Sequence, residues 1–395
     1  MKKIKIYLSE RTNFLILLLV IIAALAGLLL YKLGSLTGGL SITEERTAAG
    51  IYGFHGIYNS PFYLPLNFVR SVVFFLFDSP GQTLTRLPNV VFGGLTIVSF
   101  AWLIRLWHGN RTALFATLLF ACAAWTLHVS RLASFDVLYL WVVPSLLLAN
   151  ALWHQNPTSK WLYYGNVALW GLMLYIPGIV WLILINLFWQ RKLISQGWKH
   201  FNAWWQRLLY LLTGLVWLPL LVIGLLKADK PLMWLGLPAQ FASPLELLRN
   251  LLAVPYHLFV RGPLYPELWL DRAPILDIFT LIVCIMGIYF YIQNRNAKRS
   301  KVLGSFFIIG VLLVAINGAV GISLLVPMLY IVAATGIAYL KREWLKVFPL
   351  NPFARTLGIS LIVLAVILSC VYNLRAYYVA WPNNNVTIQT FRYHR

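Results

Sequence analysis

The sequence predicts an all-α integral membrane protein, a single bundle of about 11 transmembrane helices with two long outer loops that carry surface helices. Hydrophobic residues make up 60% of its 395 residues, and charged residues only 11%. Apolar runs recur along the chain, and about 20 apolar residues in a helix are needed to cross the hydrocarbon core. The runs are continuous rather than alternating, which favours helices over a transmembrane β-barrel.

The formal net charge of +21 does not indicate a nucleic-acid partner. The basic residues are scattered between apolar runs and form no continuous basic face. They are better explained by positive cytoplasmic loops and by attraction to anionic lipid. Cys122, Cys284 and Cys370 all lie within apolar runs, so they indicate neither a metal-ligand spacing nor a disulfide framework.

The first half of the chain begins with a basic cytoplasmic flank and a first helix that is retained rather than cleaved. A long outer loop follows, and its apolar segment up to Phe77 is expected to lie on the membrane surface because Arg70 interrupts it. Pro177-Gly178 divides a later apolar run into two short helices. The expected elements are the flank 1–12, helix 13–33, loop 34–86, spans 87–106, 112–129 and 137–153, and the helix pair within 161–190.

The second half begins with a basic, Trp-rich surface helix at 193–206 on the cytoplasmic side. The second long outer loop, 227–273, contains leucines at helical spacing from Leu245 to Leu252. The remaining spans are expected at 208–226, 275–293, 302–316, 324–340 and 356–373. This arrangement places the N-terminus in the cytoplasm and the C-terminus outside, in a multi-pass protein of the cell membrane.

The acidic residues gather on one side of this topology. Glu10 and Glu343 fall inside, and the rest of the 11 acidic residues fall on the outer side or at its edge. Membrane orientation depends on Lys and Arg and very little on acids. Acids gathered on the outer side therefore indicate chemistry there.

Two outer segments carry the candidate site. Glu44 and Glu45 follow the first helix, and Arg131 and Asp136 follow the third. Both helices end on the same side, so these groups are expected to converge. A carboxylate there suits a general base, and an arginine presents a fork that matches phosphate. The pair suits a substrate with a lipid tail in the bilayer and a phosphate at the headgroup.

Structural explanations exist for each of these residues. Two adjacent glutamates are often a solvated charge pair, and Arg131 with Asp136 is commonly a structural ion pair. The arginines Arg46, Arg86, Arg261 and Arg272 suit snorkelling at the interface. The histidines His55, His128 and His257 have no metal-ligand spacing, so no metal site is predicted.

In order and spacing, however, the chain resembles the GT-C superfamily of polyprenyl-phosphate-sugar-dependent glycosyltransferases. It is most similar to the bacterial branch related to protein O-mannosyltransferases and to the aminoarabinose transferase of lipid A (glycosyltransferase family 39-like). The resemblance covers residues 33–190. It rests on Gly39-Leu40-Ser41 up to Glu44, Asn59-Ser60-Pro61, Arg86-Leu87-Pro88, Phe92-Gly93-Gly94-Leu95, Ser130-Arg131-Leu132-Ala133-Ser134-Phe135-Asp136 and Tyr175-Ile176-Pro177-Gly178.

This resemblance implies a GT-C catalytic core at 33–190 and a C-terminal transmembrane part at 191–395. It implies Glu44 as catalytic base with Glu45 as the second choice, and Asp136 as a second acid of the site. Arg131, with Arg46, would bind the donor phosphate. A late Arg-Tyr-Leu-Leu-Pro-like run of the family is replaced by Ile322-Ser323-Leu324-Leu325-Val326-Pro327, so Arg261 or Arg272 becomes the candidate for a late phosphate contact.

The expected function is therefore transfer of a sugar from a polyprenyl-phosphate donor to an acceptor on the outer face, with inversion at the sugar carbon. The acceptor is left open among protein, lipid and polysaccharide, as are the sugar and any divalent cation. The alternatives are a flippase or transporter of lipid-linked glycans and a structural membrane subunit. Charges at one surface and the absence of an evident internal repeat favour the enzyme.

Overall fold

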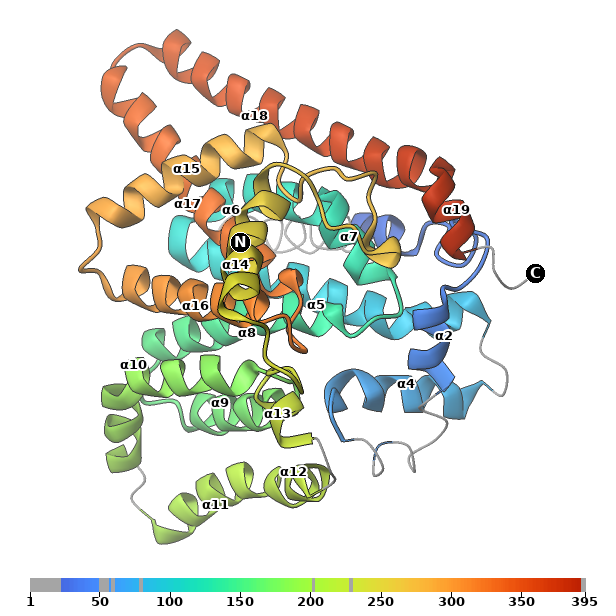
Figure 1. Cartoon of the computed structure of the whole chain (residues 1–395). Helices are drawn as coiled ribbons and strands as arrows, with labels where there is room; N and C mark the ends of the chain where they lie inside the picture. The colour runs from blue at the N-terminus through green and yellow to red at the C-terminus, as the bar shows by residue number, and fades with distance from the viewer. Residues whose placement is uncertain are drawn as a thin grey trace, which may run out of the picture.

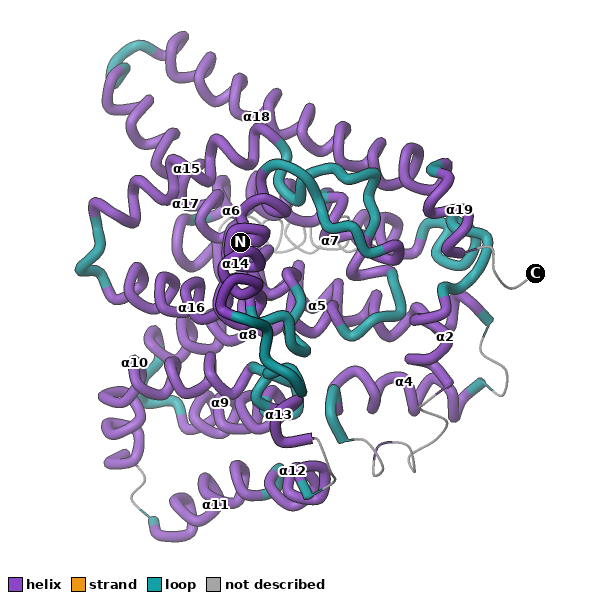
Figure 2. The backbone as a smooth tube through the Cα atoms, in the orientation of Figure 1, coloured by secondary structure: helices purple, strands orange, loops and turns teal. Residues whose placement is uncertain are grey.

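The computed structural model of the chain describes residues 23–49, 57, 61–77, 81–200, 203–226 and 230–391. Figure 2 shows helices and connecting loops throughout these ranges, which confirms the predicted all-α class. The N-terminal half contains α2 (Ile42–Ala49), α4 (Leu64–Leu76), α5 (Gln82–His108), α6 (Asn110–Cys122), α7 (Ala124–Arg131), α8 (Asp136–Gln155), α9 (Lys160–Met173) and α10 (Ile179–His200). The C-terminal half contains α11 (Trp204–Leu215), α12 (Leu218–Leu225), α13 (Lys230–Trp234), α14 (Pro244–Phe259), η1 (Pro266–Leu268), α15 (Ile278–Gln293), α16 (Lys298–Ala315), η2 (Ile322–Leu324), α17 (Leu325–Val347), α18 (Pro352–Arg375), η3 (Ala376–Ala380), η4 (Trp381–Asn383) and α19 (Asn385–Phe391).

The centre of the bundle is built from α17, α8 and α5. Of the most apolar stretch of Ile322–Val347, 89% is buried inside the protein, against 11% for Trp204–Leu225, which is the more apolar of the two. An apolar helix with so little buried surface is expected to face lipid. The α11–α12 segment therefore lies at the periphery of the bundle, as Figure 1 also shows.

Helices α15 and α17 approach each other closely at two glycines. A Cβ atom on Gly287 would lie 2.0 Å from the Val332 carbonyl oxygen, and one on Gly336 would lie 1.8 Å from the Val283 carbonyl oxygen. Small residues let helix backbones meet in membrane proteins. These two glycines hold α15 against the central helix.

Two of the predicted helix regions contain breaks. Helices α6 and α7 meet at a 61° bend, where the Asn373 side chain of α18 accepts a hydrogen bond from the free Ala124 N–H. The run at 161–190 breaks as predicted, and Gly178 there adopts a φ of +78°. Its N–H donates to the Trp234 carbonyl, so the break is also a packing point for α13.

Five described helices are long and apolar enough to cross a membrane, or six if the bent α6–α7 pair is one span. The expected spans from 87 onward correspond to helices in the structure. The total of eleven stays a prediction, because the other described helices are too short or not apolar enough to be counted with these, and the first ten residues of the expected span 13–33 lie outside the described residues. The positions of the two termini relative to the membrane also stay predictions.

Three expected boundaries are wrong. The Glu44–Glu45 segment is helical and forms α2, not a loop. Helix α5 begins at Gln82, about five residues early, which places Arg86 within it. The separate surface helix expected at 193–206 does not form, because α10 continues through Arg191 to His200 and α11 begins at Trp204.

The elements that carry the predicted site lie at one end of the bundle. In Figure 1, α2, α7 and α19 are on the right, whereas the α15–α16 turn and the α17–α18 connection are on the left. The left-hand turn leads into the basic residues Lys298 and Arg299. The predicted site thus lies at the end of the bundle opposite this basic turn.

Candidate active site

The first helix of the site begins with a reciprocal cap. The Glu44 N–H donates to Ser41 Oγ over 3.2 Å, and the Ser41 N–H donates to Glu44 Oε2 over 3.0 Å. This is the capping-box arrangement that a Ser-x-x-Glu sequence favours. It fixes both the start of α2 and the direction of the Glu44 side chain.

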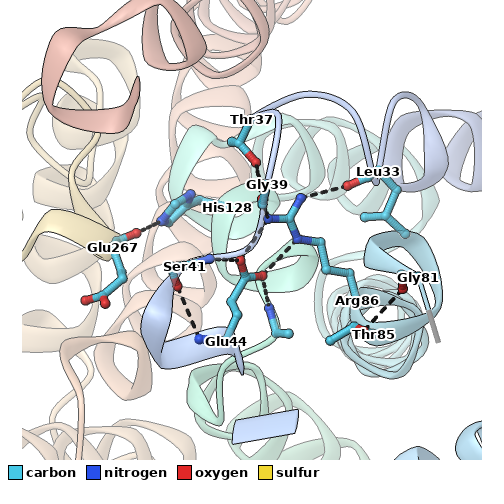
Figure 3. A network of polar contacts seen from close by, with 11 residues as sticks. Leu33, Thr37, Gly39, Ser41, Glu44, Gly81, Thr85, Arg86, His128 and Glu267 are labelled. Carbon is cyan, nitrogen blue, oxygen red and sulfur yellow. Dashed lines mark hydrogen bonds and ion pairs between the residues drawn. The ribbon is translucent and has the colours of Figure 1, made fainter. Parts of the chain in front are cut away.

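Arg86 of α5 binds the same carboxylate with two parallel hydrogen bonds. Its Nε and Nη2 atoms donate to Oε1 and Oε2 of Glu44, each over 2.8 Å, and both side chains are almost fully buried (Figure 3). The guanidinium also donates to the Leu33 and Gly39 carbonyls and to Thr37 Oγ1. Arg86 therefore fastens the segment before α2 to α5 and is not a snorkelling arginine.

A fourth donor to Glu44 comes from the segment after α7. The Ala133 N–H donates to Glu44 Oε1 over 2.8 Å. The predicted convergence of the two outer segments is thus seen in the structure. Each carboxylate oxygen of Glu44 now accepts two hydrogen bonds, which fills the roughly four acceptor positions that a carboxylate has.

Arg131 ends α7 and is also buried, with 3% of its surface exposed. Its Nη2 donates to the Tyr31 carbonyl, and the guanidinium lies 5.3 Å and 5.0 Å from the ring centres of Tyr377 and Tyr378. Its Nε and Nη1 atoms have no hydrogen-bond partner among the described residues. The expected ion pair with Asp136 does not form.

A small pocket lies beside Arg131, with room for about one water molecule. Arg86, Arg131, His128, Thr37 and Trp381 contribute to its lining. His128 donates from Nε2 to the Glu267 carbonyl over 2.6 Å, and its buried Nδ1 has no described partner. In the neutral ring Nδ1 is an acceptor, and in the charged ring it is a donor. Two guanidinium donors and one ring nitrogen beside this pocket are therefore without a hydrogen-bond partner among the described residues.

A third buried arginine lies nearby on α4. Arg70 donates from Nη2 to Asn89 Oδ1 and lies 5.2 Å from the Phe135 ring centre, while its Nη1 has no described partner. Asn89 donates in turn to the Ser134 carbonyl. Burial lowers the pKa of the Arg70 guanidinium to about 9, and the charge of Glu44 acts in the opposite direction. The segment between α7 and α8 is thus held by α2, α4 and α5 together.

The other predicted residues lie outside the pocket beside Arg131. Asp136 is the first residue of α8, and its carboxylate packs against Gly321. A Cβ atom added to that glycine would lie 2.5 Å from Asp136 Oδ1. Glu45 is half-buried and Arg46 is exposed, both on α2. Arg261 and Arg272 lie on two segments of one loop. A backbone hydrogen bond from the Gly262 N–H to the Arg272 carbonyl holds these segments together. None of these side chains lines the pocket beside Arg131.

Sequence reasoning missed Glu267, Thr43 and the counter-charge role of Arg86. The Ser-x-x-Glu spacing from Ser41 to Glu44 is the capping-box pattern, and it could have indicated a structural role for Glu44. No pattern in the sequence links Glu44 to Arg86 or Thr43 to Glu267, because these contacts join residues far apart in the chain. Among the described residues, no group of three or more His, Cys, Asp or Glu side chains is arranged to hold a metal ion.

No protein-family model and no curated protein sequence matches this chain. Solved structures, in contrast, do match this chain. The crystal structure of ArnT from Cupriavidus metallidurans in the apo state aligns over 96% of this chain and 76% of its own, with a TM-score of 0.55 and 14% identity. The same protein bound to undecaprenyl phosphate aligns over 94% of this chain and 76% of its own, with a TM-score of 0.52 and 14% identity. The resemblance predicted from the sequence is thus confirmed at the level of the fold, and this chain has the fold of ArnT.

Proposed function

We propose that this protein is a membrane glycosyltransferase that takes a sugar from a polyprenyl-phosphate donor. The observation that carries the proposal is the surplus of buried positive charge at one end of the bundle. Arg70, Arg86 and Arg131 are each at most 3% exposed, and Glu44 pairs with Arg86. A buried charge is costly unless it is paired. An anionic ligand beside Arg131 would supply the missing partner.

The fold supports a lipid phosphate as that anion. ArnT, which shares the fold, has been crystallised with undecaprenyl phosphate. In this chain a phosphate could accept from Nε or Nη1 of Arg131, the two guanidinium nitrogens that have no hydrogen-bond partner among the described residues, and such charge-assisted hydrogen bonds are strong.

The chemistry would be displacement of the phosphate from the sugar carbon. A base removes a proton from the acceptor, the acceptor attacks with inversion, and the polyprenyl phosphate leaves with the bonding electrons. Arg131 would stabilise the charge that develops on the leaving phosphate. The sequence-based roles stay proposals: Glu44 or Glu45 as base, Asp136 as a second acid, and Arg46, Arg261 and Arg272 as further phosphate contacts.

The test of the phosphate site is lipid binding. Purified protein in mild detergent is titrated with undecaprenyl phosphate and observed by native mass spectrometry, beside Arg131→Ala and the exposed control Arg355→Ala. We expect saturable binding to the wild type and the control, and at least a tenfold weaker binding to Arg131→Ala. Equal binding by all three proteins would refute the site.

Activity separates the enzyme from a flippase of lipid-linked glycans, which would bind the same lipid. Proteoliposomes are supplied with undecaprenyl phosphate carrying mannose, glucose or aminoarabinose, together with a cell-envelope extract as the acceptor source. Release of undecaprenyl phosphate with sugar incorporation supports the transferase. Movement of the intact donor between leaflets without sugar transfer would favour the flippase.

A further inference from the structure

We propose that a groove between α15, α16 and α17 binds one anionic phospholipid of the bilayer, with an acyl chain in the groove and the headgroup phosphate beside Arg295. The groove has a volume of about 280 Å³. Its lining includes Ile292, Arg295, Ser300, Gly304, Phe307 and Met328. Its polar end lies at the α15–α16 turn, opposite α2 and α7 in Figure 1, so this site is separate from the pocket beside Arg131.

The groove has the shape of a channel for one chain. On α16 it follows a single face of the helix, because Ser300, Gly304 and Phe307 recur at helical spacing. The buried side chains of Met328 and Leu329 on α17 form its floor. From Ser300 to Phe307 the groove runs about 10 Å along α16, at about 1.5 Å per residue. One leaflet contributes about 15 Å of hydrocarbon, so the groove accommodates most of one acyl chain.

The polar groups along the groove are already hydrogen-bonded within the protein. The Tyr291 hydroxyl shares a hydrogen bond with Thr335 Oγ1 over 3.0 Å, and Ser300 Oγ donates to the Asn294 carbonyl over 2.7 Å. Among the described residues, no lining side chain has a buried polar atom without a partner. The interior of the groove therefore suits a hydrocarbon chain better than a polar molecule.

Gly304 keeps the groove open. A Cβ atom added to Gly304 would meet nothing within 4 Å, although the residue lies within α16. Glycine inside a helix is less favourable than alanine. Close backbone contact explains Gly287 and Gly336, but it does not explain Gly304. The missing side chain instead leaves room for a chain that lies along α16.

The polar end of the groove is positively charged. Arg295 is exposed there, and its side chain makes no hydrogen bond or ion pair with the described residues. The two neighbouring cations are engaged elsewhere, since Lys298 Nζ donates to Gln190 Oε1 and Arg299 lies over the Trp107 ring. No acidic residue lines the groove. Basic pockets between membrane helices bind the headgroups of anionic lipids, so the charge selects an anionic headgroup.

The test is lipid selection, measured by native mass spectrometry. The purified full chain in mild detergent is offered equal amounts of dioleoyl phosphatidylglycerol, which is anionic, and dioleoyl phosphatidylcholine, which has the same chains and no net charge. We expect one saturable site that prefers phosphatidylglycerol about fivefold, the contribution of one basic residue near a headgroup. Arg295→Gln should bind the two lipids equally. Lys301→Gln should keep the preference, because Lys301 is an exposed cation of the same region that does not line the groove.

A second variant fills the groove. Gly304→Leu should weaken the binding of both lipids at this site about tenfold or more, because it excludes methylene groups from an apolar site. The matched control is Gly165→Leu, since Gly165 of α9 also has open space around it, and it should bind like the wild type. A phosphatidylglycerol with a diazirine in one chain should crosslink to Phe307 or Met328 in the wild type and not in Gly304→Leu. Melting temperatures that match the wild type would show that the variants are folded.

Three results would overturn this inference. Equal binding of the two lipids by the wild type would show that the groove takes any acyl chain. An equal loss of preference in Arg295→Gln and Lys301→Gln would show a general attraction to the basic surface. Displacement of phosphatidylglycerol by undecaprenyl phosphate at a lower concentration would make the groove a polyprenyl site. None of these results affects the proposed function, which is tested separately at Arg131.

Discussion

Replacing Glu44 by Ala tests whether the buried ion pair is a structural element. The change removes an acceptor of four hydrogen bonds and leaves the Arg86 guanidinium buried without its counter-charge. Hydrogen bonds to a charged group contribute about 1.5–3 kcal/mol each, so four of them would sum to about 6–12 kcal/mol if they were independent. They are not independent, because they share one side chain.

The loss expected from Glu44→Ala is therefore the cost of breaking a buried pair, about 3–5 kcal/mol. Arg86 keeps three other acceptors, which favours the lower part of that range. The measurement is thermal unfolding of the purified protein in one detergent, with the yield of monodisperse protein as a second readout. We expect a melting temperature several degrees below the wild type.

Two further variants test whether loss of the Glu44–Arg86 ion pair causes the lower melting temperature. The double variant Glu44→Ala with Arg86→Met should be less destabilised than the sum of the single changes, because removing both charges leaves neither unpaired. Glu343→Ala is the surface control, since Glu343 pairs with Arg342 and Lys346 in an exposed position, and it should melt like the wild type. A Glu44→Ala protein that melts within about one degree of the wild type would refute a structural role for the pair.

Two other changes probe the bundle itself. Gly336→Ala places a methyl group against a carbonyl oxygen of α15, so it should lower the free energy of unfolding by about 3 kcal/mol or lower the yield of folded protein. The control is Gly304→Ala, because Gly304 has open space around it. In the thermal unfolding assay this control should melt like the wild type. Equal melting of the two glycine variants would show that α15 and α17 can separate at no cost. Asp277→Ala leaves the hydrogen bonds from Thr280 and from Ser369 and Asn373 of α18 without their acceptor, so we expect a loss of about 3 kcal/mol, and unchanged melting would contradict the described network.

The helices could be predicted because the membrane dictates a simple pattern. A continuous apolar run must satisfy its backbone internally, so nearly every run found in the sequence is a helix in the structure. The break at Pro177-Gly178 was also predictable from local chemistry. The end of α10 was not predictable in this way, because the basic pair Arg191-Lys192 predicts a helix end that the structure does not have. Charged side chains leave the hydrocarbon without ending the helix, and α10 continues past them to His200.

The site was predictable in location but not in its internal pairing. The two outer segments converge as expected, since helices that end on one side bring their loops together. The partner of Glu44 was not predictable, because Arg86 lies 42 residues away and the choice among several arginines depends on the packing of α2 against α5. Glu267 is the extreme case, since its contact with Thr43 spans 224 residues and arises from the whole bundle.

Two nitrogens of Arg131 have no hydrogen-bond partner among the described residues, and they lead to a last prediction, about ligand-dependent stability. Stacking on Tyr377 and Tyr378 stabilises the guanidinium, but it supplies neither a counter-charge nor acceptors for Nε and Nη1. A ligand that binds the folded state alone adds about 2.7 kcal/mol of stability at 100 times its dissociation constant. Undecaprenyl phosphate should therefore raise the melting temperature of the wild type and leave that of Arg131→Ala unchanged. Undecaprenol, which has the same tail and no phosphate, should have no effect on either protein. If undecaprenol stabilises the wild type as much as the phosphate does, the tail alone is recognised, and the unpaired nitrogens of Arg131 have another explanation.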